Sequence, residues 1–121
     1  MKNLSVSSVE ELVIRFVNLA LAQDQALLQD EISKFNVLFR QMHAVIDELK
    51  SRPGDGRHAL LDLYGHPNLQ VRLKAVKNSL ALAPDEGRRV LQAIADSREY
   101  PQAMEAGMSL SNLDQGIFKP T

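Results

Sequence analysis

Apolar side chains recur along this chain at the three- and four-residue spacing of helices, in blocks separated by polar or Pro/Gly-rich breaks. The first block has one apolar face, made of Val9, Leu12, Val13, Phe16 and Ala20. Two overlapping capping-box patterns, in which a serine stands three residues before a glutamate, precede it at Ser7–Glu10 and Ser8–Glu11. The pattern predicts a helix that begins close to residue 9.

The second block is longer. The apolar pattern lapses at residues 23–25, where Asp24 can cap a new helix, and then continues in steps of four and three through Leu28, Ile32, Phe35, Phe39, Met42, Ile46 and Leu49. Neighbouring leucines and valines widen this stripe, which is typical of packing inside a helical domain and not of a free-standing coiled coil. We expect one helix over residues 24–50, with Phe39 in the core.

Pro53-Gly54-Asp55-Gly56 should end that helix, because proline removes a backbone donor and glycine permits turn geometry. Residues 58–82 then read as two helices joined by a turn at residues 65–68, with an apolar stripe that resumes at Leu69, Leu73, Val76 and Leu80. A pair this short cannot bury its apolar faces alone. Stacked neighbours would cover them, which is the organisation of an α-solenoid.

Two more helices complete the chain. Pro84 suits the first position of a helix and is followed by acids that complement the helix dipole, and Tyr100-Pro101 begins a last helix that Gly116 should cap. No segment alternates with the period of a strand. The sequence therefore predicts an all-α protein, a short α-solenoid of about five to six helices that forms a single domain over residues 1–121.

Composition narrows the function classes. The 14 Lys and Arg nearly balance the 15 Asp and Glu, so no summed field favours nucleic acid or an anionic membrane. No stretch has the apolar length of a membrane span, and Glu10 and Glu11 interrupt the region where a signal peptide would need an apolar run. The chain has no cysteine, which removes disulfides and thiolate chemistry. We expect a cytoplasmic protein.

The residue types that carry catalysis are present without a catalytic arrangement. His43, His58 and His66 lack the spacing that puts two metal ligands on one helical face, and we expect His43 on the polar side of its helix, opposite Phe39. No serine lies in a glycine-framed elbow, and adjacent acidic pairs splay across their helices. We predict no enzyme activity, no catalytic residue, no metal site and no cofactor.

What remains is surface for a protein partner. In stacked helix pairs the second helices line one side, here near residues 24–50, 68–82 and 101–115. Tyrosines close to the turns are candidate aromatic anchors, and Gly107 beside Met104 and Met108 indicates close helix packing. The predicted contact residues are Arg40, Asp47, Tyr64, Lys74, Asn78, Tyr100, Glu105 and Asn112.

Two stretches carry a resemblance. His66-Pro67-Asn68 followed by Val71, Arg72 and Ala75 is similar to the turn and second helix of a HEAT repeat, although HEAT repeats prefer aspartate in the turn. The longer run from Arg52 to Pro120 resembles a bacterial family of unknown function with an armadillo/HEAT-like helical fold.

Members of that family are often encoded beside polymorphic toxins. The resemblance implies an immunity protein, or antitoxin, that neutralises a cognate toxin encoded next to it by direct stoichiometric association. The alternative is a HEAT-like scaffold or adaptor in a cytoplasmic complex.

Overall fold

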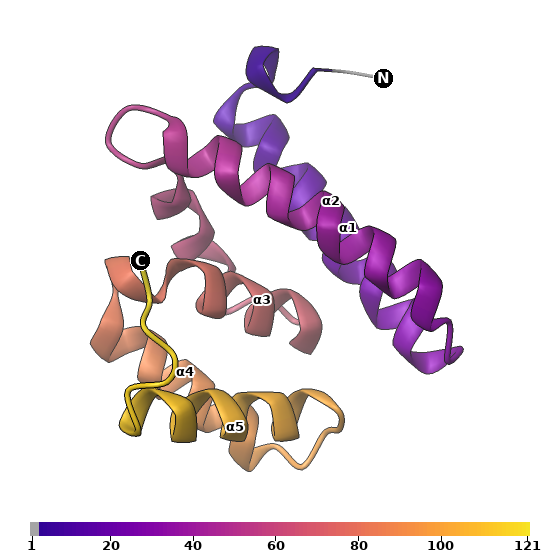
Figure 1. The fold of residues 1–121 in the computed structure, drawn as a ribbon, viewed down its shortest axis with the longest axis vertical. Coiled ribbons are helices and arrows are strands. Elements are labelled where there is room, and N and C mark those ends of the chain that lie inside the picture. The colour runs from indigo at the N-terminus through magenta and orange to yellow at the C-terminus, as the bar shows by residue number, and fades with distance from the viewer. Residues whose placement is uncertain (1–2) are drawn as a thin grey trace. The chain divides into compact units, whose positions relative to one another are not determined.

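The computed structural model describes residues 3–121, and every regular element in that range is helical. Five α-helices and three short 3-10 helices follow one another along this part of the chain, with no strand (Figure 1). The prediction of an all-α protein is confirmed. The chain forms two compact units, one that ends at Ala59 and one that begins at Leu60, and none of the described helices is long and apolar enough to cross a membrane. The single domain over residues 1–121 and the solenoid arrangement stay predictions.

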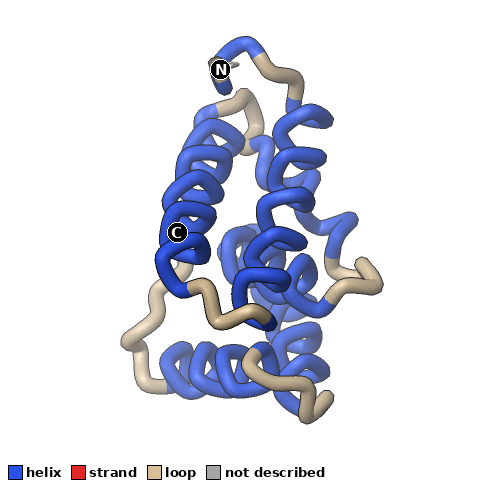
Figure 2. The backbone as a smooth tube through the Cα atoms, turned by 90° about the vertical axis from the view of Figure 1, so that its right-hand side faces the viewer, coloured by secondary structure: helices blue, strands red, loops and turns tan. Residues whose placement is uncertain are grey.

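The first unit is a hairpin of two helices, α1 (Val9–Leu28) and α2 (Ile32–Ser51), which lie side by side (Figures 1 and 2). Its buried apolar residues come from both helices: Leu12, Phe16, Leu19, Ala20, Ala26, Met42, Val45, Ile46 and Leu49. On each helix these residues lie along one face, with the buried Gln23 between Ala20 and Ala26, so the hairpin is held together by one mainly apolar stripe from each helix.

The break between the two helices was predicted at residues 23–25, and this was wrong. Gln23 is fully buried, and its amide donates a hydrogen bond to the Met42 sulfur at 3.8 Å, so the polar triplet stays helical. The chain instead turns at Asp30, where φ is 56°. Asp30 N donates to Leu27 O and Glu31 N donates to Ala26 O, the two bonds of a Schellman motif. Aspartate tolerates this left-handed conformation better than most side chains, which is the signal that the sequence offered.

The first half of α2 is more exposed than its apolar stripe predicted. The buried residues of α2 begin only at Met42, whereas Ile32 is 68% and Phe39 is 43% exposed. Phe39 is therefore not in the core. Its ring meets that of His43 edge to face, with centroids 4.8 Å apart, so His43 lies beside Phe39 and not opposite it. Residues four apart share a helix face, which explains the contact.

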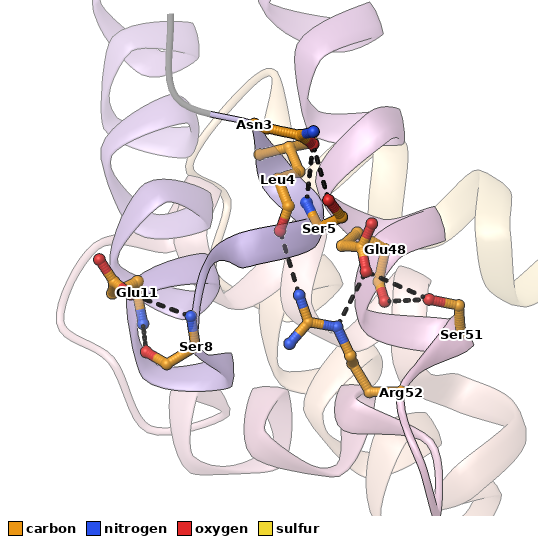
Figure 3. A network of polar contacts seen from close by, with 8 residues as sticks. All are labelled: Asn3, Leu4, Ser5, Ser8, Glu11, Glu48, Ser51 and Arg52. Atoms are coloured by element: carbon orange, nitrogen blue, oxygen red, sulfur yellow. Dashed lines mark hydrogen bonds and ion pairs between the residues drawn. The ribbon is translucent and has the colours of Figure 1, made fainter.

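A polar network ties the beginning of the chain to the end of α2 (Figure 3). After the 3-10 helix η1 (Leu4–Val6), Ser8 caps α1, and Ser8 and Glu11 form the reciprocal capping box that the sequence predicted. Arg52 donates to the Leu4 carbonyl oxygen at 3.0 Å and pairs with Glu48 at 2.8 Å. The Arg52 side chain thus holds the backbone of η1 against the end of α2, across 48 residues of sequence.

A 3-10 helix, η2 (Gly56–Leu63), contains the boundary between the units. The sequence predicted an ordinary helix there. The segment follows Gly54 and Asp55, which both have positive φ, and its eight residues form 3-10 turns in place of an α-helix.

The second unit contains α3 (Leu69–Ser79), η3 (Leu80–Leu82), α4 (Pro84–Asp96) and α5 (Gln102–Asp114). Helix α4 packs against both α3 and α5, and α3 also contacts α5. The apolar core of the unit consists of Leu60, Tyr64, Val71, Leu73, Ala75, Val76, Leu80, Leu91, Ile94, Ala103, Ala106 and Leu110.

Helix ends in the second unit follow the local signals. Asn68 caps α3 by accepting a hydrogen bond from Val71 N, and Pro84 opens α4. Gly116, with φ of 71°, ends α5 as predicted. Ile117 N donates to Asn112 O at 2.9 Å and Gly116 N donates to Leu113 O, which is again a Schellman motif.

Candidate protein-binding groove

The side of α3 that faces α5 is polar. Gln70, Lys74 and Lys77 stand four and three residues apart, so they share one face of the helix. Gln70 accepts a hydrogen bond from the Gln102 amide at 3.0 Å, and both lysines reach Glu105, at 2.8 Å for Lys74 and 3.1 Å for Lys77. These polar contacts fix the register of α3 against α5.

Glu105 is held ionised by its two lysines. Burial alone would raise the pKa of its carboxyl, but the charges of Lys74 and Lys77 and their hydrogen bonds outweigh that effect and lower the pKa. One oxygen, Oε2, accepts from both ammonium groups. Two cations against one carboxylate leave one unit of positive charge at the junction of α3 and α5.

An open groove of about 330 Å³ runs beside this cluster. It is lined by Lys77, Pro101, Met104, Glu105, Met108, Ser109 and Asn112. All but Lys77 lie on α5 or in the Pro101 turn that precedes it, so the groove depends on how α5 is placed against α3. We call these seven residues the α5 groove.

Two methionines border the α5 groove and expose most of their surface. Met104 is 60% and Met108 is 59% exposed, and their four-residue spacing puts them on one face of α5. Methionine is flexible and polarisable, and it is over-used at binding surfaces because it adapts to the shape of a partner. Sequence reasoning did not select them, since apolar residues at helical spacing usually face the core.

Gly107 lies between these methionines in a helix interior. The sequence indicated close helix packing at this glycine, and the structure contradicts it, because a Cβ added there would meet nothing within 4 Å. Gly87 of α4 behaves in the opposite way, since an added Cβ would collide with Leu80. The packing within this chain therefore does not explain why residue 107 is a glycine.

Four of the eight predicted contact residues come together in this region. Glu105 and Asn112 line the α5 groove, Lys74 pairs with Glu105, and Asn78 donates its amide to Lys74 O at 2.8 Å. Lys74 itself is only 7% exposed, so its prediction as a surface contact was wrong. Its side chain is buried because Glu105 neutralises it.

The other four predicted residues lie elsewhere. Tyr64 is buried and not a surface anchor, because its hydroxyl reaches Ser79 Oγ at 2.7 Å. Tyr100 is 66% exposed just ahead of the Pro101 turn. Arg40 and Asp47 are exposed on α2 in the first unit.

The first unit has a groove of its own with weaker recognition chemistry. It has a volume of about 460 Å³ and is lined by Ser7, Glu11, Ile14, Arg15, Asn18 and Leu19. Its lining contains one arginine and one glutamate, Arg15 and Glu11, so it carries no excess positive charge, and Glu11 is already used in the helix cap. Across residues 3–121, His, Asp and Glu form no group of three or more that could hold a metal ion.

A solved structure is very similar to this chain. It is the crystal structure of the protein RPA1889 from Rhodopseudomonas palustris CGA009, with 48% sequence identity, a TM-score of 0.95 and full coverage of both chains. No curated protein matches. Residues 10–114 match the family model DUF2019, a domain of unknown function. The match includes all of α2, α3, α4 and α5, so the chain belongs to the DUF2019 family.

Proposed function

We propose that this protein acts by binding a partner protein through the α5 groove and its methionine border. The observation that carries the proposal is the exposure of Met104 and Met108 beside an anchored charge cluster. Protein interfaces have this anatomy: an apolar centre enriched in methionine and aromatic residues, surrounded by polar side chains. The exposed Tyr100 supplies an aromatic residue close to the beginning of the same helix.

The partner in this proposal is a toxin encoded next to the protein, which makes the chain an immunity protein. This step rests on the resemblance to companions of polymorphic toxins and on the lack of a convergent catalytic arrangement in the sequence. A HEAT/armadillo-like stacking of helices belongs to the same proposal, since such stacks present extended binding surfaces. The alternative partner is a constituent of a cytoplasmic complex, with the chain as a scaffold or adaptor.

Co-expression with the product of the neighbouring gene tests the proposal. We expect the two proteins to copurify in a fixed molar ratio, and Met104→Asp with Met108→Asp to abolish the complex, because charged side chains are costly at the centre of an interface. The matched control is Ile14→Asp with Leu21→Asp, which changes exposed apolar residues of α1. A complex that survives the methionine substitutions and is lost in the α1 control would place binding on the other unit and overturn the assignment.

A further inference from the structure

The α5 groove contains hydrogen-bonding side chains that nothing in the described chain satisfies. Ser109 is only 4% exposed and lines the groove, yet within residues 3–121 its hydroxyl has no hydrogen-bond partner. The side-chain amide of Asn112, in the same lining, is also without a partner in that range. Neither group is a fully buried, unpaired atom, and both can donate a hydrogen bond to an acceptor that enters the groove.

The positive charge beside the groove indicates which kind of acceptor the ligand carries. An ammonium group has three N–H donors, and the only partner of Lys77 Nζ among the described residues is Glu105 Oε2. The side chain of Lys77 is 29% exposed and lines the groove, whereas that of Lys74 is 9% exposed and is not part of the lining. The pair of lysines carries one more charge than Glu105 neutralises. A carboxylate is the complement to one excess cation, one hydroxyl and one amide.

The methionine border of the groove indicates a ligand that has an apolar part as well as an anion. Met104 and Met108 offer apolar surface next to these donors, and a small carboxylate would leave both methionines in water. A peptide segment in which an acidic residue is followed closely by an apolar one would contact both kinds of surface.

We propose that the α5 groove recognises an acidic side chain of the partner protein, with its carboxylate on Lys77, Ser109 and Asn112 and an adjoining apolar side chain on Met104 and Met108. This rests on the proposed function, and it adds the chemistry by which the partner is selected. The groove distinguishes partners by the position of one acid relative to one apolar residue, since a segment without the acid leaves the donors unpaired.

Selection of displayed random peptides against the full-length protein tests this recognition. We expect enriched peptides to carry Asp or Glu within a few residues of Leu, Met or Phe. A synthetic peptide from the enriched set should bind at least about tenfold more weakly to Lys77→Ala and to the double variant Ser109→Ala/Asn112→Ala. Neither Ser109 nor Asn112 has a side-chain bond to lose within residues 3–121, so the double variant should melt like the parent.

Arg89→Ala is the matched control, because it removes an exposed positive charge from α4 outside the groove lining. Equal weakening by Arg89→Ala would reduce the effect to net charge and overturn the proposal. So would enriched peptides without an acid. Sodium acetate that binds as tightly as the peptide would show a free-anion site without a docking role, which also overturns it.

The peptide selection can succeed or fail independently of the copurification that tests the proposed function. Peptide selection does not use the neighbouring gene product, so a failed copurification leaves a positive peptide result standing. If copurification succeeds while the Lys77 and Ser109/Asn112 variants bind the partner like the parent, the proposed function stands and only the carboxylate recognition is wrong.

Discussion

The packing of α5 does not explain the glycine at position 107. A glycine in a helix interior costs about 1 kcal/mol relative to alanine, and the position has room for a methyl group. Gly107→Ala should therefore raise the free energy of unfolding by about 1 kcal/mol in urea denaturation. If the partner approaches α5 closely, the same change should weaken the complex while it stabilises the protein.

Gly87→Ala is the control for this prediction. It adds the same methyl group to a helix, but at a position where Leu80 occupies the space, so we expect a loss of stability. A Gly107→Ala protein that is less stable than the parent would mean that the helix has a packing constraint at residue 107 after all.

The contrast between Leu73 and Phe39 gives a second prediction at the scale of single residues. Leu73 is fully buried, so Leu73→Ala should cost roughly 2–5 kcal/mol of stability. Phe39 is 43% exposed, and Phe39→Ala should cost about 1 kcal/mol or less, because much of its ring is already in water. Chemical denaturation measures both, and equal losses would place Phe39 in the core as the sequence stripe predicted.

At the scale of elements, the sequence predicted the helices well where local chemistry decides their ends. Ser8, Pro84 and Gly116 act at short range, and their roles were readable. The break between α1 and α2 was missed because Gln23 is held in the helix by burial against Met42, a contact 19 residues away. Local polarity could not reveal that contact.

The pairing of α3 with α5 was beyond sequence reasoning for the same reason. Glu105 lies 31 residues from Lys74 and 28 from Lys77. Without knowledge of this distant partner, a lysine on a helix is predicted to be solvated. Polar residues at positions 70, 74 and 77 were the available signal, since together they mark a polar stripe on a helix whose other positions are largely apolar. The sequence did not predict most residues of the α5 groove. Its exposed methionines have the same helical spacing as buried apolar residues, so the pattern did not show that they are exposed.

Acid should weaken the junction of α3 and α5. The pKa of Glu105 is lowered in the folded protein, so its contribution to stability is complete above its unfolded pKa and disappears as pH falls through the lower folded value. At neutral pH we expect Glu105→Gln to lower the free energy of unfolding by about 1 kcal/mol, a modest loss because the carboxylate is partly exposed to solvent. Urea denaturation from neutral to acidic pH measures the difference between parent and variant.

That difference should shrink towards zero as pH falls through the acidic range. The pKa of Asp55 is also lowered, chiefly by its hydrogen bond from Arg57, but Asp55 is the same in both proteins and cancels in the comparison. A difference that is independent of pH would mean that the charge of Glu105 does not stabilise the junction.

At the scale of the whole molecule, periodicity was enough to predict an all-α chain, because no segment of it alternates and every break carries turn or cap chemistry. Partner recognition is the harder property to predict at this scale. The net charge of −1 provides no long-range steering, so recognition has to come from a local surface such as the α5 groove. Such a surface depends on which of several apolar stripes remains uncovered after folding.

Neutralisation of a toxin provides the last prediction. If the protein acts by association, rescue of growth should saturate when protein and toxin are present in equal amounts, and Lys77→Glu with Met104→Asp should abolish it by adding repulsion and an unpaired charge to the interface. Arg40 and Asp47 were predicted as contacts from the sequence, but the proposal places binding on the α5 groove, so Arg40→Glu with Asp47→Lys on α2 should leave rescue intact. The measurement is growth as a function of the expression level of each variant in the presence of the toxin. Rescue at strongly substoichiometric protein would require turnover, and it would replace the binding mechanism with an enzymatic one.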